Sequence, residues 1–532
     1  MEASSFEWKQ VKLGVWSRAI DEAEHFYAAL VHQYASCGRM MFAITGHVSV
    51  STPVPVGSTP LDAGTRLDTA LREAWLHVRY DYPTIASRVH LDENGAPKKT
   101  YEAFPEGDTA SAAQEAWLER TFKLVETSFS GDEWCERDPP APEFPTLFVL
   151  ASAGHAHGAS IRRDVVLRAS HDTLDGMGAL MLFDRLLQHA STILESPTPV
   201  SRPAFGSEHT RLSPPLRVAV QIPSELTEDE DSRLQAKLQL NQSVWATKEL
   251  ALLRFKIGKV VPGVHHRASL VLTKEETSAV IKRAKMMGLT PTHAFHAAMA
   301  MATRDIQSRT SEPREVRFIN YLVFSERAQC VEPYNCTEHA VAVYHSLGED
   351  VLVVDLQVPA VNNEPSLASQ IEEFKSIAET VKSVYANTRQ DTEHIKRIAC
   401  SWKALCAPFV AESPSAPPPP QPFSYASLSS VGRIDSVLST QYGPLTVQRP
   451  WVTSERLDNF LGVFLSAFDG QLELSSTWND AWHTKTDVDS FLERCKSIVL
   501  RSLQVETLDG DNGHEIPSSP SAERCIRRRL HK

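Results

Sequence analysis

The sequence lacks long hydrophobic runs and has no excess of basic residues. No segment approaches the roughly 18 consecutive apolar residues that a membrane-spanning helix needs. Residues 1–10 are polar and lack the apolar core of a secretory signal. These absences predict a cytoplasmic protein without a membrane span. The formal net charge of -12 also provides no general basic surface for a phosphate polymer, so we do not expect nucleic acid as a partner.

Cysteine pairs and short catalytic motifs are missing as well. The 8 cysteines form no CxxC pair and their spacing does not fit a zinc site, so we expect reduced thiols. His155 and His157 form a His-Ala-His pattern, but spacing marks no third ligand, and we expect no metal. GxSxG motifs and Gly-rich phosphate loops are absent, which argues against hydrolase and nucleotide-binding chemistry.

Length and composition predict a globular protein of several folding units. The chain has 532 residues, of which 42% are hydrophobic and 23% charged, and this length suggests roughly two to four units. Residues 197–215 are rich in proline and lack periodicity, which indicates a crossover between two halves. We therefore expect an N-terminal half at 1–205, a crossover and C-terminal half at 206–504, and a polar, disordered tail at 505–532.

Helical and strand-like periodicities alternate along both halves. We expect helices at 20–36, 67–80, 274–287 and 294–304, a helix that begins near Gly176, and strands at 40–50, 146–151, 163–170 and 267–272. The acidic run at 228–231 is typical of a solvated helix start.

An HxxxDG pattern is the strongest functional motif in the sequence. His171, Asp175 and Gly176 follow the apolar run 165–167 and precede the expected helix. A histidine at the end of a strand can serve as a general base, while Asp175 and Gly176 hold the shape of the loop. We expect Gly176 to keep the loop tight where no Cβ fits. A plainer interpretation makes His171 a satisfied strand-end histidine and Asp175 an ordinary N-cap.

Other short stretches occur in an informative order along the chain. They lie at 74–80, 83–86, 290–294, 339–345, 429–435 and 478–480. Together with HxxxDG, they resemble the condensation-domain-like, coenzyme A-dependent acyltransferase superfamily, and within it the fungal trichothecene 15-O-acetyltransferase type. The resemblance extends from residue 10 to residue 500.

The resemblance implies an α/β fold made of two chloramphenicol-acetyltransferase-like halves. Each half would have a mixed β-sheet flanked by helices, and His171 would lie in an active-site tunnel at their interface. Residues 339–345 would form an internal strand, and 478–480 would end the strand before the final helix. Residues 429–435 would form a glycine-containing strand turn. Its Ser429, Ser430 and Gly432 are our candidates for oxyanion or substrate binding, with Ser430 preferred.

Three departures from the superfamily limit what carries over. Ser170 stands where peptide-forming condensation domains have a second histidine, and the DFGWG element of plant relatives is absent. Leu322 occupies the place of an arginine that pairs with the motif aspartate in relatives of this type. Asp175 therefore needs another cation, for which Arg327 is the candidate.

The resemblance implies transfer of an acyl group, preferably acetyl, from coenzyme A to a hydroxyl of a hydrophobic secondary metabolite such as a terpenoid or polyketide. His171 would take the hydroxyl proton, and the partners would be the acceptor and the coenzyme A thioester. A monomer is a separate expectation that the resemblance does not supply. One alternative is a stand-alone condensation-like enzyme that uses a carrier-protein-bound acyl chain or catalyses a cyclisation. Another is a non-catalytic binding protein. His293 and His296 are expected to pack or cap a helix, or else to line the acceptor channel.

Overall fold

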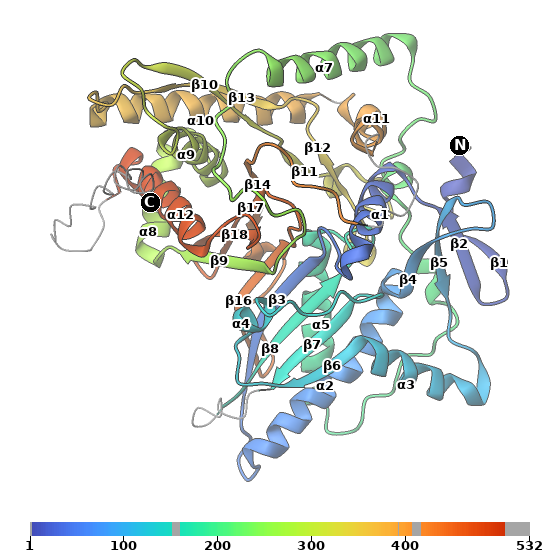
Figure 1. Cartoon of the computed structure of the whole chain (residues 1–532). Coiled ribbons are helices and arrows are strands. Elements are labelled where there is room, and N and C mark those ends of the chain that lie inside the picture. Colours follow the sequence, from blue (N-terminus) through green and yellow to red (C-terminus); the bar gives the residue numbers. More distant parts are fainter. Residues whose placement is uncertain (1–2, 152–159, 392, 407–415, 506–532) are drawn as a thin grey trace, which may run out of the picture.

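The computed structural model describes residues 3–151, 160–391, 393–406 and 416–505 (Figure 1). His155, His157 and the expected tail beyond Val505 lie outside the described residues. Two separate β-sheets, each covered by helices, form the main body of the chain.

A six-stranded mixed sheet forms the core of the first half. Its strand order is β15-β16-β3-β8-β7-β6, in which only β6 and β7 pair in parallel. The strands are β3 (Ile44–Pro53), β6 (Phe122–Glu126), β7 (Thr146–Ala151), β8 (Ser160–Ala169), β15 (Gln441–Tyr442) and β16 (Leu445–Ser454). Helices α2 (Pro60–Asp81) and α5 (Gly176–Glu195) pack on each other and on this sheet. Strand β8 thus runs through a buried core directly to the loop of His171.

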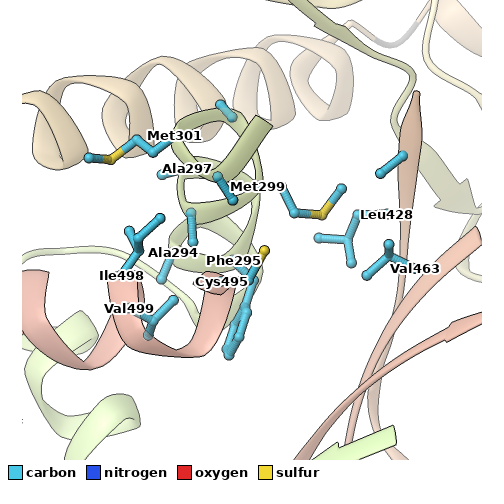
Figure 2. Packing of buried hydrophobic residues seen from close by; sticks show 14 of the residues in the cluster. Ala294, Phe295, Ala297, Met299, Met301, Leu428, Val463, Cys495, Ile498 and Val499 are labelled. Carbon is cyan, nitrogen blue, oxygen red and sulfur yellow. The ribbon is translucent and has the colours of Figure 1, made fainter. Parts of the chain in front are cut away.

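The second half has a four-stranded mixed sheet with the order β14-β17-β18-β9. Its strands are β9 (His265–Val271), β14 (Ala426–Arg433), β17 (Leu461–Phe468) and β18 (Gln471–Asn479). Helix α9 (Pro291–Asp305) is rich in alanine and lies at the centre of this core. Figure 2 shows α9 between α12 (Lys485–Ser502), which carries Cys495, Ile498 and Val499, and the strands that carry Leu428 and Val463.

The remaining elements surround these two cores. An outlying sheet has the order β1-β2-β5-β4, and two short pairs are β10 with β13 and β11 with β12. These strands are β1 (Lys9–Lys12), β2 (Val15–Ala19), β4 (Ser87–Leu91), β5 (Pro97–Glu102), β10 (Arg314–Asn320), β11 (Val323–Ser325), β12 (His345–Leu347) and β13 (Leu352–Val358). The other helices are α1 (Glu22–Tyr34), α3 (Ala110–Thr121), α4 (Gly131–Cys135), α6 (Leu216–Ala219), α7 (Glu228–Ala246), α8 (Lys274–Met286), α10 (Leu367–Gln390) and α11 (His394–Cys406). Helices α1 and α11 pack together beside the two main sheets.

The expected helices and strands are confirmed, with one correction. Residues 339–345 do not form an internal strand: a 3-10 helix ends at His339, and only His345 enters a strand, β12. The main-chain N–H of Tyr344, just before β12, instead donates a hydrogen bond to the carboxylate of Asp175. The division at residues 205 and 206 stays a prediction, and β15 and β16 complete the first sheet from the second half of the sequence. Among the described residues, no helix is long and apolar enough to cross a membrane.

Candidate active site

Asp175 begins helix α5 and fixes the loop that carries His171. Its extended backbone and side chain form the N-cap, and Oδ1 accepts a hydrogen bond of 2.7 Å from the main-chain N–H of Gly178. Asp at an N-cap satisfies a main-chain donor that the helix leaves unpaired. Asp175 is therefore the N-cap that the plainer interpretation made it, and its second carboxylate oxygen is left for other partners.

Arg327 supplies the cation that Asp175 needs. Its Nη2 lies 2.8 Å from Oδ1 of Asp175, and Oδ2 accepts a 2.9 Å hydrogen bond from the N–H of Tyr344. Burial by itself raises the pKa of the Asp175 carboxyl, but the Arg327 guanidinium and His345 outweigh it and hold that pKa well below its ordinary value. The candidate pairing is confirmed. Leu322, at the place of the arginine in relatives, is fully buried.

His171 lies half-buried after β8, with its ring stacked on that of Tyr27. The ring centroids are 3.8 Å apart and the planes differ by 12°. Nδ1 of His171 is buried, and no described residue gives it a well-formed hydrogen bond. Burial and the neighbouring His345 lower the pKa of His171 to about 3, against the opposing effect of Asp175. The imidazole is therefore neutral at physiological pH, as a general base must be.

Two further residues of the site, Tyr27 and His345, were missed by the sequence analysis. The hydroxyl of Tyr27 lies 2.7 Å from Nε2 of His345, whose Nδ1 lies 3.9 Å from Oδ2 of Asp175. Tyr27 has the sequence pattern of a core aromatic on an amphipathic helix, so nothing local distinguishes it. His345 ended one of the stretches that carried the resemblance, which was the only signal available.

The three candidate oxyanion residues lie on β14. A bulge separates Ser430 from Gly432, and Gly432 is exposed with a φ of +81°. The hydroxyls of Ser430 and Thr292 share a 2.8 Å hydrogen bond, while Val431 packs against the core of the first half. Among the described residues, no hydrogen bond joins Ser429, Ser430 or Gly432 to the His171 loop. Their role stays a prediction.

Two cavities adjoin the elements of the site. One of about 1090 Å³ is lined by Ser170, Asp172 and Thr173 together with strands of the outlying sheet. The other, of about 270 Å³, lies beside α7 and is lined by residues that include Trp245, Tyr321 and Leu347. The first has ample volume for a small-molecule substrate. A tunnel that joins both faces at His171 stays a prediction.

The helix-start glycine that cannot accept a side chain is Gly178 rather than Gly176. A Cβ on Gly176 would meet two methyl groups of Val452 at an ordinary 3.5 Å. A Cβ on Gly178 would overlap the carbonyl oxygen of Ala340 and lie 3.1 Å from Nη2 of Arg327. The expectation that no Cβ fits at Gly176 is therefore wrong, because the close approach occurs two residues further along, at Gly178.

Exchanging each glycine for alanine tests this assignment. We expect Gly178→Ala to destabilise the protein by about 1–3 kcal/mol through overpacking and to displace the Asp175–Arg327 pair. We expect Gly176→Ala to leave stability unchanged or to raise it by up to about 1 kcal/mol, since alanine favours helix. Urea unfolding of the two variants measures both effects, and equal losses would contradict the assignment.

His293 and His296, which the sequence placed on a helix, both have structural partners. His296 is fully buried on α9, 3.1 Å from the hydroxyl of Tyr385, so it does not line a channel. His293 belongs to the capping box at the start of α9. Within the described ranges, no group of three or more His, Cys, Asp or Glu residues could hold a metal ion.

Comparison with known proteins gives relatives of low sequence identity. No protein-family model matches the chain. It is 23% identical to the O-acetyltransferase pigM of Monascus ruber over 94% of this chain and 88% of that protein. It is 22% identical to the azaphilone biosynthesis cluster protein M of Aspergillus terreus over 68% and 83%, respectively.

Solved structures of low sequence identity match nearly the whole chain. The trichothecene 15-O-acetyltransferase TRI3 of Fusarium sporotrichioides has a TM-score of 0.75 at 17% identity, and the match covers 94% of this chain and 99% of that one. The condensation domain of the monacolin K polyketide synthase MokA has a TM-score of 0.55 at 13% identity, with 92% and 98% covered. The predicted resemblance and the predicted fold class are confirmed.

Proposed function

Because the chain has the fold of the condensation-domain-like acyltransferases, we propose that it is an O-acetyltransferase of secondary metabolism that acetylates a hydroxyl of a hydrophobic small molecule. The observation that carries this proposal is the complete HxxxDG loop, with a neutral His171 and an ion-paired Asp175. The relative aligned over 94% of the chain is named an O-acetyltransferase, which confirms the expected acyltransferase class. Acetyl-coenzyme A as donor and a terpenoid or polyketide as acceptor are the finer parts of the proposal, as is a cytoplasmic monomer.

His171 performs the proton transfer in the proposed mechanism. Its Nδ1 is buried, so Nε2 accepts the proton of the acceptor hydroxyl while that oxygen bonds to the thioester carbonyl carbon. The carbon–sulfur bond then breaks, and the proton passes from Nε2 to the departing thiolate. Ser430 on β14 is the proposed donor to the transient oxyanion. Asp175 and Arg327 hold the loop in place and touch neither substrate.

The direct test is to incubate the purified protein with acetyl-coenzyme A and a panel of hydroxylated terpenoids and polyketides. Thiol release that depends on an acceptor, together with a product 42 mass units heavier by the chemistry of acetylation, supports the proposal. No release and no binding of the thioester would favour a carrier-protein donor or a cyclisation. The lower TM-score of the condensation domain gives that alternative no support over the acetyltransferase.

The pH dependence of the reaction provides a second test. Because burial lowers the pKa of His171 to about 3, its base form is already complete in mildly acidic solution. We expect kcat/KM, which reports the free enzyme, to show no fall attributable to His171 between about pH 8 and pH 5. A fall with a midpoint near the ordinary histidine pKa of about 6.5, absent when His171 is replaced, would contradict this environment.

A further inference from the structure

We propose that Tyr27 and His345 are positioning residues that hold the imidazole of His171 in its productive orientation. This inference rests on the proposed function and adds two residues from distant parts of the chain to its site. Tyr27 belongs to α1 and His345 to β12, so neither is part of the HxxxDG loop. Both act on His171 without any need to contact substrate.

The contacts form a continuous path from the aspartate of the motif to its histidine. Oδ2 of Asp175 faces Nδ1 of His345 at 3.9 Å, and Nε2 of His345 meets the Tyr27 hydroxyl at 2.7 Å. The ring of Tyr27 then covers one face of His171. His345 also lies beside His171, with ring centroids 5.2 Å apart. The two ends of the motif are therefore connected through α1 and β12.

The proton on the Tyr27–His345 hydrogen bond has a defined location. Burial and the Asp175 charge raise the pKa of the Tyr27 phenol well above its ordinary value, so the hydroxyl keeps its proton and can donate it. A Tyr27 hydroxyl that donates to Nε2 of His345 leaves the ring hydrogen on Nδ1. That N–H points to the side of Asp175, whose carboxylate is held ionised by Arg327. The hydrogen bond thus fixes the His345 tautomer.

Surrounding aromatic side chains hold this arrangement in place. Trp402 on α11 presents its ring to His345 at a centroid distance of 5.6 Å and a plane angle of 86°, and it also packs near Tyr27 at 5.8 Å. Tyr27 and His345 are 7% and 8% exposed. A phenylalanine in place of Tyr27 would fill the same core, so the hydroxyl has no evident purpose in packing alone. Among the described residues, the Tyr27 hydroxyl forms a hydrogen bond with His345 alone, and this points to orientation of the site.

The kinetic test compares two buried tyrosine–histidine pairs of the same chain. Tyr27→Phe keeps the stacked ring and removes only the bond to His345. We expect about a ten-fold lower kcat for acetyl transfer with KM changed less than about two-fold, the size of one ordinary buried hydrogen bond. The matched control is Tyr385→Phe, which removes the 3.1 Å bond to His296 in the core of the second half. Equal kcat values for the two variants would overturn the proposal.

Replacement of His345 separates positioning from packing. Glutamine can accept a hydrogen bond from the Tyr27 hydroxyl, whereas leucine cannot. We expect His345→Gln to retain most of the wild-type kcat and His345→Leu to lose about ten-fold. A change in KM without a change in kcat in His345→Leu, or equal kcat in both variants, would show that His345 does not orient the base.

A spectroscopic measurement tests the same arrangement without any acyl transfer. The titratable groups that face His171 are Tyr27 on α1, His345 on β12 and Asp175 on its own loop. The protein is labelled for NMR at the histidine ring carbon between the two nitrogens, and the signal of His171 is assigned by its absence in His171→Gln. In the wild type, the chemical shift of this signal should not titrate between about pH 5 and pH 8. Tyr27→Leu uncovers the ring, and the signal should then titrate in that range.

The outcome separates failure of this inference from failure of the proposed function. An unchanged His171 titration in Tyr27→Leu overturns the positioning role even if the enzyme transfers acetyl groups. A changed titration supports that role even if no acetylated acceptor is found. Tyr385→Phe should leave the His171 signal as in wild type, because its hydroxyl contacts His296.

Discussion

Replacement of His171 by glutamine is expected to lower the rate of acyl transfer by about 10²–10⁴-fold, the usual contribution of a general base. Glutamine has nearly the volume of histidine but cannot take up the acceptor proton at neutral pH. Binding of acetyl-coenzyme A should persist, since the variant keeps the Asp175–Arg327 pair and the fold of the loop. The measurement is steady-state acetyl transfer, with thioester binding followed by calorimetry.

His296→Gln is the matched control for this prediction. His296, like His171, has a pKa lowered to about 3, mainly by burial, and it too contacts a tyrosine. It lies in the core of the second half, where the protein gives it no access to substrate. Its replacement should affect stability and leave kcat unchanged. Comparable activity in both glutamine variants would mean that another group removes the acceptor proton.

Local sequence patterns were enough to predict the strand, loop and helix that present His171. Strand β8 (Ser160–Ala169) covers nearly all of the expected strand at 163–170, and α5 begins at the expected Gly176. These elements are specified by nearby residues, namely an apolar strand, an N-cap aspartate and an amphipathic helix. Arg327 could also be named, because a buried carboxylate requires a cation and the usual position holds leucine.

The rest of the site depends on contacts between distant segments. Tyr27 and His345 are separated by 318 positions, and no periodicity or capping rule links two such residues. The pairing of β16 with β3 likewise joins the two halves of the chain. Gly176 and Gly178 look equivalent in the sequence, and only the approach of the Ala340 carbonyl distinguishes them. Such features are set by tertiary packing, so the sequence alone does not predict them.

Removal of Arg327 is expected to have the largest effect on stability. The side chains of Arg327 and Asp175 are 12% and 7% exposed, so Arg327→Met leaves a buried carboxylate without its cation, at a cost of about 3–5 kcal/mol. Asp175→Asn keeps the N-cap but leaves the guanidinium unpaired. The double variant should lose about 1–3 kcal/mol less unfolding free energy than the sum of the two single losses, as measured by urea unfolding.

Arg304→Met is the control for that double-mutant cycle. Arg304 pairs with Glu373 in the second half, so its loss should add to that of Asp175→Asn without coupling. If the stability losses of Arg327→Met and Asp175→Asn were also additive, the two residues would have no energetic coupling.

The same pair predicts how stability depends on pH. In the wild type, the pKa of Asp175 is lower in the folded than in the unfolded chain. Its contribution is therefore complete above the unfolded value of about 3.9 and is lost as the pH falls toward the folded value. In Arg327→Met, burial is no longer opposed by the guanidinium, and the folded pKa of Asp175 should rise above the unfolded value. The destabilisation of the variant relative to wild type should then grow as the pH rises from about 4 and shrink on acidification. A difference that does not change with pH would mean that Arg327 stabilises the fold through its bonds to main-chain carbonyls, such as that of Ala340, rather than through the charge of Asp175.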